Sequence, residues 1–214
     1  MLSLEDIMQL FNFIGSLVCH QKPERTLRVG GHYLPVCARD TGVFVGLYLG
    51  YALLFFLRDK KARGPPNLYV TAVMTAPLLV DSFGQLLGFW TSTNDLRVIT
   101  GLLFGTALAP FLVYALSFFH FKDKIPFLRK IQPENAVLDA EDQWLNEKAL
   151  LLGIILSAIL FFAIKLMLDS NFYPFYWIIS TPIIFGIIWH FFILLPTLIV
   201  ITAKHCTRRP KSKN

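Results

Sequence analysis

The sequence predicts an all-α, polytopic transmembrane helical bundle with five spans and one short N-terminal helix. Its 214 residues are 55% hydrophobic and only 16% charged, an apolar composition for a soluble protein of this length. Five apolar runs approach or exceed the length that crosses a bilayer. We therefore expect one multi-pass domain of the cell membrane over residues 1–203, followed by a basic tail over residues 204–214.

The first segment, residues 2–18, is apolar but short. At about 1.5 Å per residue, a helix of this length falls short of the ~30 Å hydrocarbon core. Glu5, Gln9, Asn12 and Ser16 recur at helical spacing and form one polar stripe on it. Two interpretations stay open, an interfacial amphipathic helix or a sixth, tilted span that lines a polar cavity.

The five predicted spans are separated by polar or charged connections. Gly42, Gly46 and Gly50 recur every four residues in the first span, and Gly101 and Gly105 repeat this spacing in the third. Small residues at this spacing allow two helix backbones to approach closely, so these faces are expected to pack. The spans cover residues 41–57, 68–90, 98–119, 149–168 and 177–203.

The distribution of basic residues predicts the orientation in the membrane. Fourteen of the 20 lysines and arginines lie in residues 58–63, 122–148 and 204–213. Because cytoplasmic loops are enriched in basic residues, these segments and the C-terminus are expected in the cytoplasm. The segment 19–40 is then extracytoplasmic. The net charge of +6 is accounted for by topology, and we expect the lipid bilayer rather than a nucleic acid as the partner.

Residues 19–40 form a polar segment, predicted as a loop, between the first helix and the first span. The segment contains two of the three cysteines and two of the five histidines of the chain. Thiolate, imidazole and carboxylate groups are the ligands of zinc and of other transition metals, so the loop is a candidate metal site. The candidate ligands are Cys19, Cys37 and Asp40, together with His20 or His32.

A disulfide between Cys19 and Cys37 is an equally weighted alternative. Extracytoplasmic cysteines commonly pair, and a bond across 18 residues would stabilise the fold by about 3 kcal/mol. Thiol–disulfide catalysis is disfavoured, because the chain has no reactive C-x-x-C arrangement.

The arginines of the same region suggest binding of an anion. Arg25, Arg28, Arg39 and Arg97 offer forked donors suited to phosphate, such as that of a lipid or a lipid-linked substrate. The alternative is that each arginine pairs with a carboxylate and fastens the outer helix ends together. Further ligand-binding candidates are Gln21, Gln85 and Asn94.

Asp81 is the strongest candidate outside the loop. A carboxylate in a membrane helix is costly, so we expect it to face the bundle and to pair with Arg39, Arg97 or a cation. The alternative is an interhelical hydrogen bond with Gln85 as companion. We also expect Lys165 to pair with Asp169, and His190 to form one interhelical hydrogen bond. The candidate catalytic residues are Asp81, Arg97, Arg39 and Arg25.

The pattern C-H-Q-x-P-x-R at residues 19–25, followed by L-P-V-C-A-R-D-T-G at 34–42, resembles a family of small membrane proteins of bacteria and archaea. The family is catalogued as the domain of unknown function two thousand and eighty-five. The likeness covers about the first half of the chain and implies no assigned activity. Asp40 stands where the family usually has a second cysteine. The positions that match its signature are Cys19, His20, Gln21, Arg25, Cys37, Arg39, Asp81, Asn94 and Arg97.

These observations predict a membrane-embedded, metal-dependent enzyme that acts on a lipid or lipid-linked substrate. The first alternative is a non-enzymatic structural or binding protein with a Cys19–Cys37 disulfide. A small transporter is a further alternative, disfavoured because no chain of ionisable residues crosses the membrane. The sequence predicts no oligomeric state.

Overall fold

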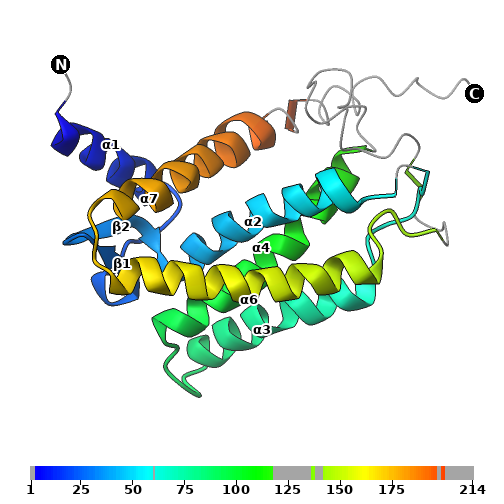
Figure 1. Cartoon of the computed structure of the whole chain (residues 1–214), viewed down its shortest axis with the longest axis horizontal. Coiled ribbons are helices and arrows are strands. Elements are labelled where there is room, and N and C mark those ends of the chain that lie inside the picture. Colours follow the sequence, from blue (N-terminus) through cyan, green and yellow to red (C-terminus); the bar gives the residue numbers. More distant parts are fainter. Residues whose placement is uncertain (1–2, 60, 118–135, 138–141, 197–198, 201–214) are drawn as a thin grey trace, which may run out of the picture.

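The computed structural model describes residues 3–59, 61–117, 136–137, 142–196 and 199–200. It is a helical bundle with a small β-hairpin at one end, so the predicted helical membrane fold is confirmed (Figure 1). In chain order the elements are α1 (Leu4–Ser16), the 3₁₀ turn η1 (Pro23–Arg25), β1 (Thr26–Val29), β2 (His32–Cys37), α2 (Ala38–Leu57), α3 (Leu68–Leu86), α4 (Asn94–Ser117), α6 (Glu147–Asp169), α7 (Pro174–Ile187) and the π-helix η3 (Ile188–Leu194).

Among the described residues, four helices are long and apolar enough to cross a membrane. They are α2, α4, α6, and α7 continued by η3. The predicted span 68–90 is a shorter helix that ends at Leu86, and it is not among the four. Asp81, Ser82 and Gln85 lower the hydropathy of its last two turns. At 19 residues α3 is nearly as long as the 20-residue α2, so its lower hydropathy separates it from the other four.

The first helix is α1, whose 13 residues reach roughly 20 Å at the usual helical rise. It begins with a capping box, in which Ser3 and Asp6 bond to each other's backbone N–H groups. Its length favours the interfacial interpretation over a sixth span.

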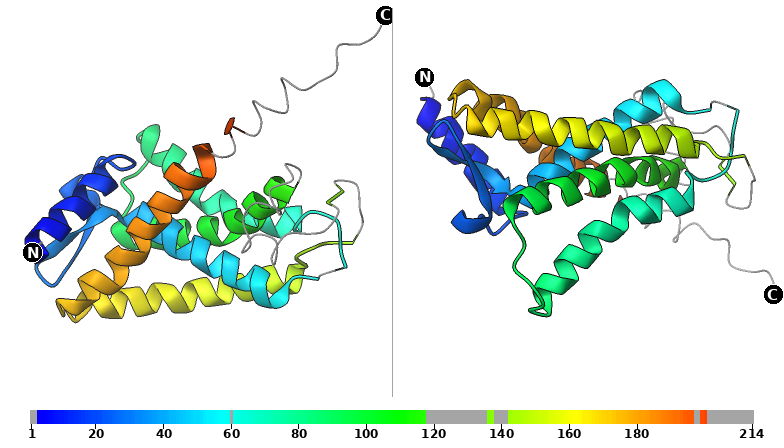
Figure 2. Two further views of the ribbon diagram at one scale, coloured as in Figure 1. Left: turned by 90° about the horizontal axis from the view of Figure 1, so that it is seen from above. Right: turned by 60° about the horizontal axis from the view of Figure 1, so that its bottom comes forward.

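The helices are arranged around the pair α2 and α4, which make the most extensive contact in the molecule. Figures 1 and 2 show α6 and α3 on one side of this pair and α7 on the other. The two backbones touch: a Cβ on Gly42 would lie 2.3 Å from the Val98 carbonyl oxygen, and one on Gly105 would lie 2.1 Å from that of Val43. A side chain at either position would separate the helices.

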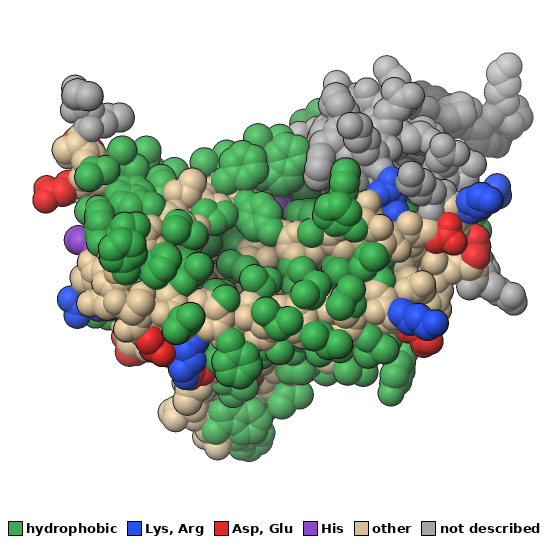
Figure 3. All heavy atoms as spheres, in the orientation of Figure 1, with side chains coloured by type: hydrophobic (Ala, Val, Ile, Leu, Met, Phe, Trp, Pro, Cys, Tyr) green, Lys and Arg blue, Asp and Glu red, His purple; other side chains and the backbone are tan. Residues whose placement is uncertain are grey.

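The surface of the bundle is apolar between two polar ends. Figure 3 shows hydrophobic side chains along the length of the helices and charged side chains gathered at both ends. On α6, Phe162 and Leu166 are 68% and 72% exposed, respectively. Such a band of exposed apolar side chains is expected of a protein that contacts lipid.

Much of the segment predicted as a loop, residues 19–40, is instead a β-hairpin followed by the first turn of α2. The strands β1 and β2 are antiparallel, and Val29 pairs with His32. The turn between them is Gly30–Gly31, with φ angles of +58° and +84°. Two consecutive residues with positive φ are required by a type I′ turn, which is why two glycines stand there.

Candidate functional site

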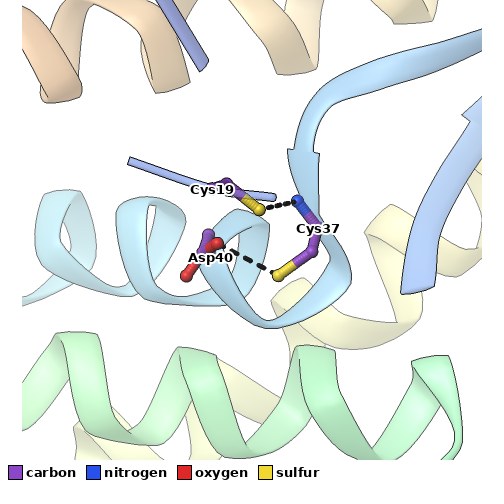
Figure 4. A group of neighbouring side chains, drawn as sticks. All are labelled: Cys19, Cys37 and Asp40. Carbon is purple, nitrogen blue, oxygen red and sulfur yellow. Dashed lines mark hydrogen bonds between the residues drawn. The ribbon is translucent and has the colours of Figure 1, made fainter. Parts of the chain in front are cut away.

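The side chains of Cys19, Cys37 and Asp40 converge at the N-terminus of α2 (Figure 4). Their three possible ligand atoms all lie within 4.8 Å of one another. The backbone N–H of Cys37 donates to Cys19 Sγ at 3.2 Å, and the Cys37 thiol donates to Asp40 Oδ2 at 3.0 Å. Both cysteines are free thiols, and Cys19 is only 8% exposed.

Local packing after α1 brings Cys19 to this position. The side-chain amide of Gln21 donates to the carbonyl oxygens of Asn12 and Pro35, each at 2.7 Å, and so ties α1 to β2. Gly15 lies directly against β2, because a Cβ there would stand 1.9 Å from the Pro35 oxygen. The ligand-binding candidate Gln21 therefore uses its amide nitrogen to hold the fold together.

The two cysteines differ in acidity although they are neighbours. The contact with the Cys37 thiol lowers the pKa of Cys19, and a backbone hydrogen bond at Gln21 lowers it further, since both favour a negative sulfur. The contact with Cys19, burial and the charge of Asp40 raise the pKa of Cys37. Cys19 is the first of the pair to become a thiolate, beside the N-terminus of a 20-residue helix.

A polar pocket of about 340 Å³ opens beside the three side chains. Two basic residues, Lys22 and Arg25, line it, and neither has a carboxylate within 4 Å among the described residues. The two basic side chains outnumber Asp40, the one carboxylate among the described lining residues, and so favour a positive potential in the pocket. The pocket residues are Val18, Cys19, His20, Gln21, Lys22, Arg25, Cys37 and Asp40.

The two histidines considered as metal ligands are not part of the Cys19–Cys37–Asp40 group. His20 lines the pocket but is exposed, and it does not join the group of converging ligand atoms among the described residues. His32 does not join this group either, and its role as a metal ligand stays a prediction. Its ring packs edge-on against Tyr173 and Tyr176, at centroid distances of 5.5 and 5.9 Å.

A second polar cluster lies where α2, α3 and α4 meet. Asp81 is 3% exposed and forms an ion pair with Arg39, so the predictions that it faces the bundle and finds a basic partner are confirmed. Asp81 Oδ1 and Arg39 Nε are buried without a hydrogen-bond partner among the described residues. No hydrogen bond joins Asp81 to the half-buried Gln85 in that part of the chain.

Arg97 completes this cluster from the first turn of α4. It is 6% exposed, and its Nη1 donates to Asn94 Oδ1 at 2.8 Å. Arg97 lies within electrostatic range of Arg25 and Arg39, and of the single carboxylate Asp81. Three guanidinium groups and one carboxylate leave a net positive charge, which is suited to an anion.

Two expected pairs outside the site have different outcomes. Lys165 binds Asp95 of α4 at 2.5 Å, so the expected pair with Asp169 is wrong, and the lysine instead ties α6 to α4. The interhelical hydrogen bond of His190 is confirmed: its Nε2 lies 2.7 Å from Tyr51 Oη.

A family model described as "Predicted membrane protein (DUF2085)" matches residues 19–111. An uncharacterised protein of Methanothermobacter thermautotrophicus is 38% identical over 92 residues, which are 43% of this chain and 81% of that protein. This chain belongs to the DUF2085 family. An uncharacterised protein of Methanocaldococcus jannaschii is 37% identical over 90 residues, which are 42% of this chain and 58% of the relative. No solved structure matches.

The part of the chain that matches the DUF2085 model contains both polar clusters. It begins at Cys19 and extends beyond Arg97, whereas α6 and α7 lie outside it. The family region is therefore the region that positions the ionisable side chains, and α6 and α7 pack around it.

Sequence reasoning did not assign Lys22 to the site. The residue stands three positions before Arg25 in the C-H-Q-K-P-E-R stretch, and η1 directs both basic side chains to the same pocket. A turn at Pro23 could have suggested this, because proline favours the first position of a helical turn.

Proposed function

We propose that this protein is a membrane-embedded, metal-dependent enzyme that acts on an anionic lipid or lipid-linked substrate. The observation that carries the proposal is the convergence of Cys19, Cys37 and Asp40 beside a pocket with two basic side chains that form no ion pair within the described part of the chain. Two sulfurs and one carboxylate oxygen are a donor set that zinc accepts, and thiolates favour zinc over magnesium or calcium.

The spacing of the three donor atoms supports a metal. Zinc binds sulfur at about 2.3 Å and oxygen at about 2.1 Å, so tetrahedral ligand atoms stand roughly 3.5–3.8 Å apart. The three atoms lie within 4.8 Å of one another, so the widest pair must close by at most about 1 Å. The N–H of Cys37 that donates to Cys19 Sγ would hold that thiolate in place, as outer hydrogen bonds do in metal sites.

Three protein ligands fit a catalytic site better than a structural one. Structural zinc sites have four protein ligands, whereas catalytic sites keep one position for water or substrate. A metal held by these residues would supply Lewis-acid chemistry at the mouth of the pocket. Lys22 and Arg25 would bind the charged oxygens of the substrate there, and their position at one end of a membrane bundle favours a head group presented by the bilayer.

Metal content tests the proposal directly. We would purify the full chain, the Cys37→Ala variant and, as matched control, the Cys206→Ala variant, and measure metal by elemental analysis. The expected result is one equivalent in wild type and in Cys206→Ala, and loss of that metal in Cys37→Ala. Absence of metal from all three would overturn the proposal.

Activity is tested with a short alkyl diphosphate, such as decyl diphosphate, in mixed micelles. Zinc-loaded wild type is expected to release inorganic phosphate, and Asp40→Asn is expected to release at least tenfold less. Equal release by the two proteins would contradict an enzymatic role of this site.

The second candidate function is a non-enzymatic membrane protein in which Cys19 and Cys37 form a disulfide. The short separation of the two sulfur atoms favours it. Intact mass distinguishes the two: under non-reducing conditions the disulfide form is lighter by two hydrogens. That mass, without bound metal, would establish the second function.

The proposed orientation places this pocket on the extracytoplasmic side and the C-terminus in the cytoplasm. It rests on the excess of basic residues in the segments 58–63, 122–148 and 204–213. An impermeant thiol reagent applied to intact cells is expected to leave Cys206 unlabelled. Labelling of Cys206 without permeabilisation would invert the orientation.

A further inference from the structure

An apolar groove of about 350 Å³ runs along the bundle between α2, α4 and η3. Most of its side chains come from these three helices, which are distant in sequence. Asp40 and His190 are the only ionisable residues among the described residues that line the groove. The others are Val18, Val43, Phe44, Leu47, Phe104, Leu108, Leu112, Phe191, Leu194 and Leu195.

The groove borders the polar pocket at the metal-ligand cluster. Val18 and Asp40 line both cavities, so the two cavities are direct neighbours. A polar pocket beside an apolar groove matches the chemistry of an amphiphile, with a charged head and a hydrocarbon tail.

The dimensions of the groove fit a hydrocarbon chain. Phe104, Leu108 and Leu112 repeat every four residues and form one face of α4, which covers about 12 Å at the helical rise. An apolar face of this length, with no charged side chain along it, suits a hydrocarbon chain.

His190 lies at the end of the groove opposite Asp40, and its ring has no free polar atom to offer a ligand. The Nδ1 of His190 donates to the Gly186 carbonyl oxygen at 2.7 Å, which leaves Nε2 to accept from Tyr51 Oη at 2.7 Å. Both ring nitrogens are satisfied within the protein. Beyond Asp40 the groove thus offers mainly apolar contact, which a hydrocarbon tail can use and a polar ligand cannot.

We propose that this groove holds the hydrocarbon chain of the lipid substrate, while the anionic head lies in the pocket with Lys22 and Arg25. This inference rests on the proposed function and specifies its substrate class, a single-chain lipid phosphate. The tail lies in the groove formed by α2, α4 and η3, and its burial supplies binding free energy that the head alone would lack.

Photocrosslinking in nanodiscs tests the placement of the tail. The probe is dodecyl phosphate with a diazirine at the end of the chain, and labelled residues are located by mass spectrometry of the full-length protein. We expect labels on Leu108, Leu112 and Phe191, with competition by unlabelled dodecyl phosphate and none by inorganic phosphate at the same concentration.

Two matched variants make the test specific. Leu108→Trp fills the groove and is expected to reduce labelling at least tenfold, whereas Leu152→Trp, on the exposed face of α6, leaves it unchanged. If Leu108→Trp does not fold by circular dichroism, Leu112→Phe replaces it, with a smaller expected loss of about threefold.

The two proposals fail in different ways. Labels spread over outward-facing residues such as Phe162 and Leu166, or labelling unaffected by the groove variant, would overturn the groove inference even if the protein binds metal. Labels in the groove of a protein without metal would support the groove and refute the metal-dependent function.

Discussion

Arg39→Met removes the charged partner of a carboxylate that is almost completely buried. Asp81 is 3% exposed, whereas the side chain of Arg39 is 23% exposed. Methionine keeps the apolar stem of arginine, so the change removes mainly the charge. Asp81 would remain buried, with Arg97 only in electrostatic range and with one oxygen that already has no hydrogen-bond partner among the described residues.

The cost of this substitution has an upper limit set by proton uptake. Breaking a buried ion pair from one side typically costs about 3–5 kcal/mol. A carboxyl group with an ordinary pKa of 3.8 can instead bind a proton at pH 7, at about 1.36 kcal/mol per pH unit, so the part of the cost that comes from the unpaired charge cannot exceed roughly 4 kcal/mol. We expect about 3–4 kcal/mol at pH 7, decreasing by about 1.4 kcal/mol for each unit that the pH is lowered towards 4.

The reverse substitution is expected to cost less. Asp81→Asn leaves a guanidinium group that reaches solvent, and the amide oxygen can still accept a hydrogen bond, so we expect about 1–2 kcal/mol. The double variant Arg39→Met/Asp81→Asn leaves neither charge without its partner, so its destabilisation is smaller than the sum of the two single costs. The coupling free energy of the pair is expected to be about 2–3 kcal/mol.

Reversible unfolding by SDS in mixed micelles measures these free energies. The matched control is the ion pair Lys165–Asp95, whose side chains are 45% and 57% exposed, respectively. Its coupling is expected to lie below about 1 kcal/mol, because solvent screens it. Equal coupling in both pairs, or no dependence of the Arg39→Met cost on pH, would refute the reasoning from burial.

Two further predictions concern the helix contact and the cysteine pair. Gly105→Ala is expected to destabilise the protein by about 1–3 kcal/mol in the same assay, because its Cβ would meet the backbone of Val43 at 2.1 Å. Gly153→Ala, which meets flexible side chains, should cost less. In metal-free protein, the difference in thiolate absorbance between wild type and Cys19→Ser should titrate below pH 9.0, and a midpoint above it would contradict Cys19 as the first thiolate. At pH values well below the pKa of Cys19, both thiols are protonated, so wild type and Cys19→Ser have the same thiolate absorbance.

Hydropathy predicted the spanning helices but placed their N-terminal ends too late. α2 begins at Ala38 rather than at residue 41, and α4 at Asn94 rather than at residue 98. The first turns contain Arg39 and Arg97, which look like loop residues until their partners on other elements are known. Tertiary contacts determine these boundaries, so a local pattern cannot supply them.

The hairpin had a local signal that pointed to it. Leu27 and Val29 alternate with polar residues before Gly30–Gly31, and a two-glycine turn between short apolar strands favours a hairpin. The hairpin explains why His32 does not converge with Cys37. His32 and Cys37 are five residues apart on β2, and an odd separation on a strand directs side chains to opposite faces.

Both polar clusters depend on the N-terminus of α2, because the stretch from Cys37 to Gly42 contributes side chains to each of them. Successive residues of a helix point about 100° apart, so neighbours in this stretch serve different partners. Asp40 points to the pocket shared with Cys37, Arg39 reaches Asp81 on α3, and Gly42 touches the backbone of α4. The close contact of α2 with α4 therefore sets the rotation of α2, and that rotation in turn aims the thiol, the carboxylate and the guanidinium group. A glycine that binds no ligand thus contributes to the geometry of the candidate metal site, because any side chain at that position would turn or displace the helix that carries the ligands.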